Sequence, residues 1–281
     1  MSPRLAPDFD PALTGASRSA LLELGRALKH YADALVLVGG WVPYLLIEAR
    51  LRPGNPFTHV GSIDIDLVVD PHKVGEDEYR TIVELITSIG WRAIEGKHFS
   101  FSRAVACEDG QVREIQVDFL TVAPNGPGSR HRHRPVQSDL QARTMRGAEL
   151  ALTHKAVRRL SGRLPDGAET SIELLMLDPV GCLGTKGIAL GERFKQKDAY
   201  DIVSLLDDYG SSVREVAELV RPCRVEPMMA EALRVIAEKF RTERSEGPMW
   251  YAEFLGGEQV ARERNAQRAA QLASEFSRLL E

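Results

Sequence analysis

Apolar residues in the first part of the chain predict a helix, a short strand and a second helix. Across 16–31 they recur three or four positions apart, as on one face of a helix. The next segment, Leu35–Val38, is continuously apolar and predicts a buried strand. After Gly39 and Gly40, apolar residues return to helical spacing across 41–50. The pattern predicts a strand, a glycine turn and a helix in direct succession.

Alternating polar and apolar residues across 61–69 predict the next strand. One face of this strand would carry Ser62, Asp64 and Asp66, since strand side chains alternate between faces. Carboxylates two residues apart project the same way, roughly 7 Å apart at about 3.3 Å rise per residue. Asp is depleted in strands, and two carboxylates on one face repel each other unless something neutralises them. Because hard divalent cations take oxygen ligands, Asp64 and Asp66 are candidate metal ligands.

A third carboxylate, Asp118, lies on the polar face of another predicted strand, 112–120. The apolar side chains of this strand, Ile115, Val117 and Phe119, share the opposite face. If the two strands are neighbours, Asp118 lies beside Asp64 and Asp66. The alternative is a solvated carboxylate near the end of a strand.

The Gly39-Gly40 turn and Ser62 are candidate contacts for a phosphate. Glycine has no Cβ, so the backbone at this turn can approach a phosphate closely. A helix that begins directly after the turn offers free N–H groups to an anion. The Ser62 hydroxyl can donate a hydrogen bond to a phosphate oxygen. A glycine pair after a strand is otherwise often only a turn.

The remaining pattern predicts an α+β fold: residues 1–177 form a mixed sheet that bears the site, and residues 178–281 form a helical bundle. Further elements are expected as a helix at 76–89, strands at 91–94, 99–105 and 171–177, and helices at 213–220, 227–244 and 250–280. Residues 149–163 fit either a helix or a strand. His131 to Arg134 is expected to be a surface loop, and the roles of His131 and His133 are left open.

A second polar stretch begins at Asp178, which precedes Pro179 as a helix N-cap. Lys186 and Arg193 are seven residues apart, and they lie near one helical face. Asp198, with Asp201 three residues later, has the spacing of an N-cap and capping box for the next helix. That structural role competes with a functional one for both carboxylates.

These stretches resemble known families. Gly39-Gly40 followed by Asp64-x-Asp66 resembles the signature of the nucleotidyltransferase superfamily. A second pattern narrows the resemblance: Lys186…Arg193-x-Lys195-x-Lys197-Asp198-x-x-Asp201. Together, the two patterns are similar to the AbiEii/AbiGii-type (MenT-like) nucleotidyltransferase toxins of type IV toxin–antitoxin systems. The resemblance covers about 35–206. It implies a nucleotidyltransferase-like core that transfers NMP from an NTP to an RNA acceptor, often tRNA, under restraint by a cognate antitoxin protein.

The resemblance also implies roles for individual residues. The catalytic set would be Asp64, Asp66, Asp118, Lys186, Asp198 and Asp201, with one or two Mg²⁺ ions on the first three. The NTP would be held by Gly39, Gly40, Ser62, Arg193 and Lys195. Two alternatives remain open. The same core could modify an antibiotic or a protein, or it could be a catalytically silent module that binds a partner.

Composition fits an ordinary soluble protein. The chain has 281 residues, of which 43% are hydrophobic and 27% charged. The three cysteines are scattered, as expected of reduced thiols in the cytoplasm. The N-terminus lacks an apolar signal core, and the most apolar region, 34–47, is too short to span a bilayer. We therefore expect a cytoplasmic protein that does not enter a membrane.

The formal net charge is −4, but residues 130–163 carry nine Lys or Arg against two acids. A local basic block in an acidic chain is a candidate footprint for a polyanion. The residues expected to contact RNA are Arg132, Arg134, Arg158 and Arg159. The alternative is a solvated surface on which these charges are interspersed with acids.

Overall fold

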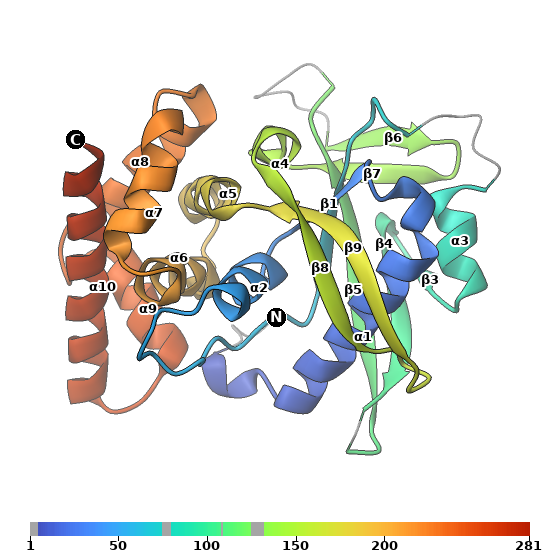
Figure 1. Ribbon diagram of the computed structural model, residues 1–281, viewed down its shortest axis with the longest axis horizontal. Coiled ribbons are helices and arrows are strands. Elements are labelled where there is room, and N and C mark those ends of the chain that lie inside the picture. Colours follow the sequence, from blue (N-terminus) through green and yellow to red (C-terminus); the bar gives the residue numbers. More distant parts are fainter. Residues whose placement is uncertain (1–4, 75–79, 108, 125–131) are drawn as a thin grey trace. The chain divides into compact units, whose positions relative to one another are not determined.

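The computed structural model describes residues 5–74, 80–107, 109–124 and 132–281 (Figure 1). These residues form two compact units. The sheet unit comprises Asp10–Trp41 and Ser62–Leu177. The helical unit comprises the segment ending at Phe9, Val42–Gly61 and Asp178–Glu281. Each unit is therefore assembled from segments that are distant in the sequence.

One mixed sheet forms the sheet unit. Its strands are β1 (Leu35–Val38), β2 (Ile65–Val69), β3 (Arg92–Ile94), β4 (Lys97–Ala106), β5 (Val112–Thr121), β6 (His133–Gln137), β7 (Leu140–Thr144), β8 (Lys155–Arg163) and β9 (Glu169–Leu177). The order is β3-β4-β5-β2-β1-β9-β8, and the β6–β7 hairpin joins β5 through β7. β2 runs antiparallel to β1 and parallel to β5. The strand that leads out of the Asp64-x-Asp66 segment thus lies in the middle of the sheet.

The face of the sheet that carries the odd-numbered residues of β5 is the core of this unit. Ile115, Val117 and Phe119 are fully buried. Ile115 pairs with Arg103 of β4, whose guanidinium contacts Glu23 of α1 (Pro11–Ala27). Gln116 and Asp118, on the even-numbered face, are half-buried. The predicted division of this strand into an apolar and a polar face is confirmed.

Two further helices, α3 (Ile82–Ser88) and α4 (Ala148–Thr153), complete the sheet unit. Thr81 caps α3 in a capping box with Glu84. The ambiguous stretch 149–163 is both a helix and a strand, since α4 ends before His154 and β8 begins at Lys155.

The helical unit contains most of α2 (Trp41–Ala49) and all of the C-terminal helices. These are α5 (Pro179–Glu192), α6 (Gln196–Asp208), α7 (Val213–Val220), α8 (Pro227–Lys239), α9 (Glu246–Leu255) and α10 (Gln259–Leu280). Asp178 caps α5 as predicted and accepts a hydrogen bond from the Gly181 N–H at 2.8 Å. Among the helices of the described ranges, none has the length and apolarity needed to cross a bilayer. The predicted class, a mixed sheet followed by C-terminal helices, is confirmed.

Within the described residues, the helices predicted at 76–89 and 227–244 are shorter, Ile82–Ser88 and Pro227–Lys239, with 75–79 outside the described residues, and two further predictions were wrong. The single helix over 250–280 is interrupted, because Gly256 and Gly257 adopt φ of 72° and 90° between α9 and α10, outside the helical region. The surface loop expected around 131–134 is the start of the β6–β7 hairpin, whose short turn at 138–139 carries none of the glycines that mark a hairpin in sequence. His131 lies outside the described residues.

Candidate active site

Asp66 and Asp118 are neighbours across two central strands. In the sheet register Asp66 pairs with Asp118 on one side and with Val38 on the other. Residues in register on adjacent strands point to the same face, about 4.8 Å apart. The two carboxylates therefore lie side by side on the even-numbered face of the sheet. This confirms that the strands carrying them are adjacent.

The Asp118 carboxylate is oriented by two donors. The Ser100 hydroxyl, fully buried on β4 in register with Asp118, donates to Oδ1 at 2.6 Å. The Gln116 side-chain amide donates to the same oxygen at 2.7 Å. Hydrogen bonds to an ionised acceptor are strong, so these donors hold the carboxylate in one orientation.

Gly39 makes room for the Asp66 carboxylate. Its φ is +74°, a conformation that favours glycine, and a Cβ placed on it would lie 2.1 Å from Asp66 Oδ2. The space left by the absent Cβ of Gly39, which was predicted to accommodate a phosphate, accommodates the carboxylate of Asp66, a candidate metal ligand. The turn after β1 and the carboxylate on β2 are therefore sterically coupled.

We expect Gly39→Ala to reduce activity far more than it reduces stability. The left-handed φ costs about 1–2 kcal/mol with a side chain, and the new Cβ would also displace the Asp66 carboxylate. Gly96→Ala is the matched control, because Gly96 has φ of +73° and no atom within 4 Å of its Cβ position. Urea unfolding should show similar losses for both variants, and turnover should fall only for Gly39→Ala. Equal turnover in the two variants would contradict the coupling.

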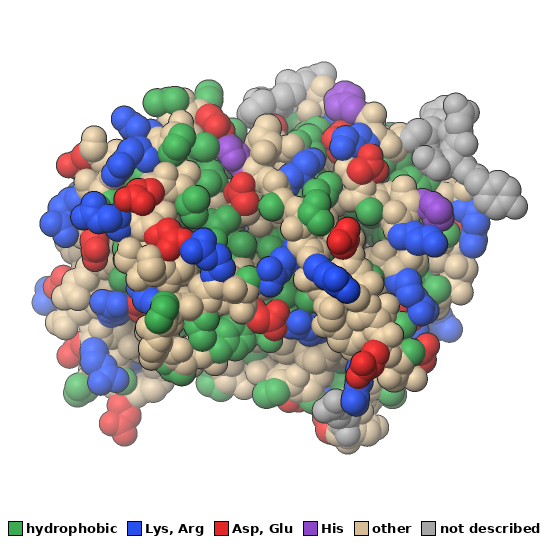
Figure 2. Space-filling view, in the orientation of Figure 1, with side chains coloured by type: hydrophobic (Ala, Val, Ile, Leu, Met, Phe, Trp, Pro, Cys, Tyr) green, Lys and Arg blue, Asp and Glu red, His purple; other side chains and the backbone are tan. Residues whose placement is uncertain are grey.

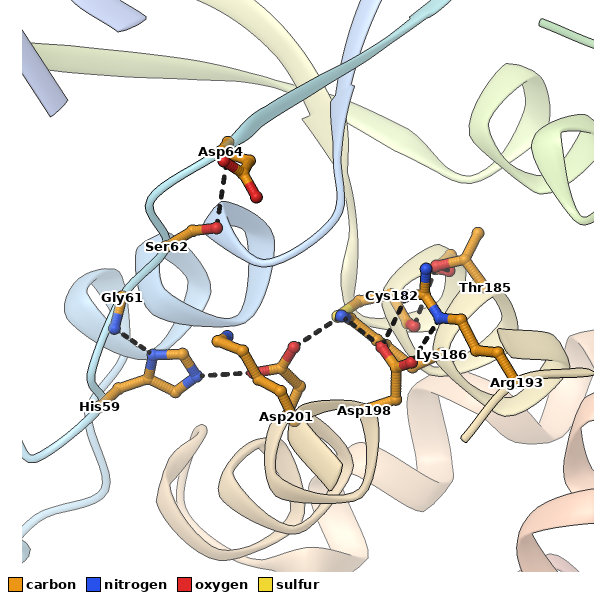
Figure 3. A network of polar contacts seen from close by, with 12 residues as sticks. His59, Gly61, Ser62, Asp64, Cys182, Thr185, Lys186, Arg193, Asp198 and Asp201 are labelled. Atoms are coloured by element: carbon orange, nitrogen blue, oxygen red, sulfur yellow. Dashed lines mark hydrogen bonds and ion pairs between the residues drawn. The ribbon is translucent and has the colours of Figure 1, made fainter. Parts of the chain in front are cut away.

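Ser62 and Asp64 do not lie on the strand, so their predicted place on one strand face with Asp66 was wrong. β2 begins at Ile65, after Gly61 takes a φ of +78°. The Ser62 hydroxyl donates to the Asp64 carbonyl at 3.1 Å (Figure 3). Ser62 is buried by this bend, whereas the Asp64 side chain is exposed. The bend, rather than strand alternation, sets the direction of Asp64.

The carboxylates fit a hard divalent cation. Asp66 and Asp118, both half-buried, supply oxygens from two adjacent strands, whereas Asp64, exposed before β2, forms no group of three ligands with them among the described residues. Mg²⁺ is usually bound through one or two carboxylates together with substrate phosphates and water. A carboxylate pair in register, packed over a residue that has no Cβ, meets that requirement.

The helical unit holds the second predicted group of residues as a buried ion cluster (Figure 3). Lys186 Nζ lies 3.0 Å from Asp198 Oδ1 and 2.6 Å from Asp201 Oδ2. Arg193 Nε lies 2.7 Å from Asp198 Oδ2, and Lys197 Nζ lies 2.7 Å from Asp201 Oδ1. Lys186, Arg193, Asp198 and Asp201, predicted to act together, are brought together. Lys195 lies on the surface beside them.

Asp198 is not an N-cap, so that structural interpretation was wrong. α6 begins at Gln196 after Lys195, which places Asp198 within the first turn of the helix. Burial would raise the pKa of Asp198, but Lys186 and Arg193 outweigh it and lower the pKa below its usual value. The carboxylate is therefore ionised and serves the ion cluster.

Asp201 is the most enclosed member of this cluster. Its side chain is 0% exposed and contacts Lys186, Lys197 and His59. Burial opposes ionisation of Asp201, yet the two lysines together lower its pKa. Burial lowers the pKa of Lys197, although Asp201 opposes that shift. Each buried carboxylate is thus neutralised by neighbouring cations, and each buried lysine by a carboxylate. Any one of these charges would be costly to bury alone.

Sequence reasoning missed His59, which is fully buried beside Asp201. The Gly61 N–H donates to Nδ1 at 3.1 Å, so the proton of the neutral ring is on Nε2, 3.3 Å from Asp201 Oδ1. The Tyr200 hydroxyl accepts from the Val60 N–H at 3.0 Å. The segment before Ser62 is therefore anchored on α6. A lone His near a glycine carries no sequence signal for such a contact.

His59 should make the protein less stable as the pH falls from 6.5 towards 4. Burial is the largest cause that lowers its pKa, from 6.5 to about 4. The unfolded chain therefore binds more protons in this window, and the free energy of unfolding falls as the pH falls. The full effect is about 3 kcal/mol. Urea unfolding between pH 5 and 7.5 should show the slope in wild type and in the control His72→Gln, an exposed position, and not in His59→Gln. An unchanged slope in His59→Gln would refute this assignment.

The four arginines predicted to contact RNA do not form one block. Arg132 directly precedes β6 and Arg134 lies in it, whereas Arg158 and Arg159 lie on β8. The sheet order places β7, β5, β2, β1 and β9 between these strands, about 29 Å at 4.8 Å per strand. Figure 2 shows Lys and Arg interspersed with Asp and Glu over the visible face. The charge excess read along the sequence is therefore divided between two margins of the sheet.

Comparisons with known proteins give two solved structures of low similarity. An antigenic nucleotidyltransferase-like protein from Paracoccidioides brasiliensis is 14% identical, with a TM-score of 0.46, over 85% of this chain and 91% of that chain. JHP933 from Helicobacter pylori is also 14% identical, with a TM-score of 0.38, over 93% of each chain. No family model and no curated protein matches the sequence. At TM-scores below 0.5, neither likeness carries a functional conclusion.

Proposed function

We propose that the chain is a metal-dependent nucleotidyltransferase that moves an NMP from an NTP to an acceptor and releases pyrophosphate. The observation that supports this most is the in-register pair Asp66 and Asp118, with Asp66 packed over Gly39. It unites a carboxylate pair suited to Mg²⁺ with a glycine turn suited to phosphate on one face of a sheet.

The roles proposed for the residues follow from this arrangement. Asp64 and Asp66 bind Mg²⁺, and Asp118 completes the site or accepts the proton of the acceptor hydroxyl. When bound, the metal would neutralise charge on the phosphates and stabilise the attacking and leaving oxygens. Gly39 and Gly40 approach the triphosphate, and the Ser62 hydroxyl would exchange the Asp64 carbonyl for a phosphate oxygen.

For the helical unit we propose that Lys186, Arg193 and Lys195 supply positive charge to the NTP. Asp198 and Asp201 would hold two of these cations in place, and the ion pairs that they form with Lys186 and Arg193 support this role. The similarity of this segment to the AbiEii/AbiGii-type toxins supports an RNA acceptor, such as tRNA, and a toxin role in the cytoplasm restrained by a cognate antitoxin.

The test is transfer from each of the four α-³²P-labelled NTPs, with Mg²⁺, to purified tRNA, total protein or an aminoglycoside in separate reactions. We expect label in tRNA, dependent on Mg²⁺ and lost with EDTA. Label in protein or aminoglycoside instead would support the corresponding modifying enzyme. Absence of label from every acceptor, with NTP left intact, would favour a catalytically silent module.

A further inference from the structure

The hairpin beside Asp118 carries an aromatic and cationic cluster that the roles above do not use. Phe99 of β4 contacts both His133 of β6 and Arg143 of β7, which are register partners. The Phe99 and His133 rings are stacked, with centroids 5.5 Å apart and an interplanar angle of 28°. The Arg143 guanidinium lies 5.3 Å from the centroid of the Phe99 ring. All three residues belong to the sheet unit.

The sheet register places Arg143 and His133 on the same face as the carboxylate pair, and Phe99, the residue before Ser100, contacts both from the start of β4. Arg143 pairs with Leu120, two residues after Asp118 on β5, and His133 pairs with Arg143. Arg143 and Asp118 therefore point to the same side, with Cα atoms about 8 Å apart from two residues of rise and one strand spacing. The other face of the hairpin is closed, because Leu140 and Ala142 are fully buried. Figure 1 shows β6 and β7 at one margin of the sheet.

The position of the cluster relative to Gly39 suggests its ligand. Gly39 follows β1, which flanks Asp66 on the side away from Asp118. The turn proposed for the triphosphate and the hairpin thus lie on opposite sides of the carboxylate pair. A second substrate that approaches Asp118 from the end of β5, where β7 pairs with it at Leu120, would meet Arg143 and His133 first.

The chemistry of the cluster suits a nucleic acid strand. His133 and Arg143 are exposed, and Arg132 precedes His133 on the surface. Guanidinium groups bind phosphate through a planar fork, and stacking on an aromatic face leaves those N–H donors available. Bases of a single strand stack on aromatic rings such as His and Phe. Contact with Phe99 holds both side chains in advance, which lowers the entropic cost of binding.

We propose that Phe99, His133 and Arg143 form a binding subsite for a single-stranded segment of nucleic acid, with a phosphate at Arg143 and a base at His133. The identification of that strand as the acceptor of transfer at Asp118 rests on the proposed function. This subsite replaces the divided arginine block as the main contact, and it assigns a role to His133.

The test measures binding of a fluorescein-labelled single-stranded RNA of twelve mixed nucleotides, without NTP, over a range of salt concentrations. Arg143→Ala should weaken binding about tenfold, as for loss of a charged hydrogen bond. It should also reduce the slope of log K against log salt by about 0.7. His133→Ala should weaken binding by a similar factor with a smaller change in slope. Arg143→Lys should keep the slope.

Arg163→Ala, an exposed arginine on β8 at the other margin of the sheet, is the matched control and should bind RNA as wild type does. NTP affinity, measured separately, should be unchanged in Arg143→Ala. Wild-type RNA affinity in Arg143→Ala and His133→Ala would overturn the subsite, as would loss of affinity in Arg159→Ala alone. Weaker NTP binding in Arg143→Ala would assign its phosphate to the nucleotide instead.

Because this assay needs no turnover, it separates the two proposals. If transfer is absent but Arg143→Ala still weakens RNA binding, the subsite stands and the transferase function falls. If transfer to RNA occurs while the hairpin variants bind RNA normally, the transferase stands and the subsite falls.

Discussion

Asp66→Asn and Asp118→Asn should each lower the rate of nucleotide transfer by at least about 10³-fold while leaving the protein folded. A metal ion contributes several kcal/mol of charge stabilisation in the transition state, and each tenfold in rate corresponds to about 1.4 kcal/mol. Stability should hold or rise slightly, because like charges directly opposite on adjacent strands repel each other. The measurements are single-turnover transfer with labelled NTP and urea unfolding.

Glu114→Gln is the control for this prediction. Glu114 is exposed on the same strand as Asp118, four residues before it and on the same face. The substitution therefore removes a carboxylate from that face without changing the pair. We expect normal transfer from it. Wild-type rates in Asp66→Asn would remove the carboxylate pair from the chemistry, and unfolding of both variants would make the pair structural.

The parts of the site that the sequence predicted are those encoded by local periodicity. Continuous apolar residues identified β1, and alternation identified the polar face of β5 that carries Asp118. Glycines placed the turn before α2. Where residues close in sequence set the geometry, pattern and structure agree.

The parts that failed depend on tertiary contacts or on single backbone angles. The left-handed φ of Gly61 moves the start of β2, so Ser62 and Asp64 leave the strand face. Asp198 looks like a helix cap by spacing, but ion pairs with Lys186 and Arg193 determine its role. Neither effect is visible in hydrophobic periodicity.

Strand order explains the arginines and His133 in the same way. A run of positive charge along the sequence becomes a surface only if its strands are neighbours, and β6 and β8 lie at opposite margins of the sheet. Conversely, Phe99, His133 and Arg143 come from three strands and meet only through the register of β4, β5, β6 and β7. Such clusters need the fold before they can be recognised.

Asp201→Asn should be the most destabilising single change in the buried ion cluster, costing about 3–5 kcal/mol, as for removal of one partner from a buried pair. The cluster holds three cations, Lys186, Arg193 and Lys197, against the carboxylates of Asp198 and Asp201. Loss of Asp201 leaves those three cations with a single carboxylate. Lys186→Met instead leaves two cations and two carboxylates, so it should cost less, although Lys186 contacts both carboxylates.

The comparison can be completed by a double variant. Adding Lys197→Met to Asp201→Asn should recover part of the lost stability, because removing both members of a buried pair avoids an uncompensated charge. Glu238→Gln, which breaks an exposed ion pair with Arg234 on α8, should unfold at the wild-type urea concentration. If Asp201→Asn unfolds at the wild-type urea concentration but loses transfer, Asp201 acts in the chemistry rather than in holding the lysines. If both stability and transfer survive, the cluster contributes to neither.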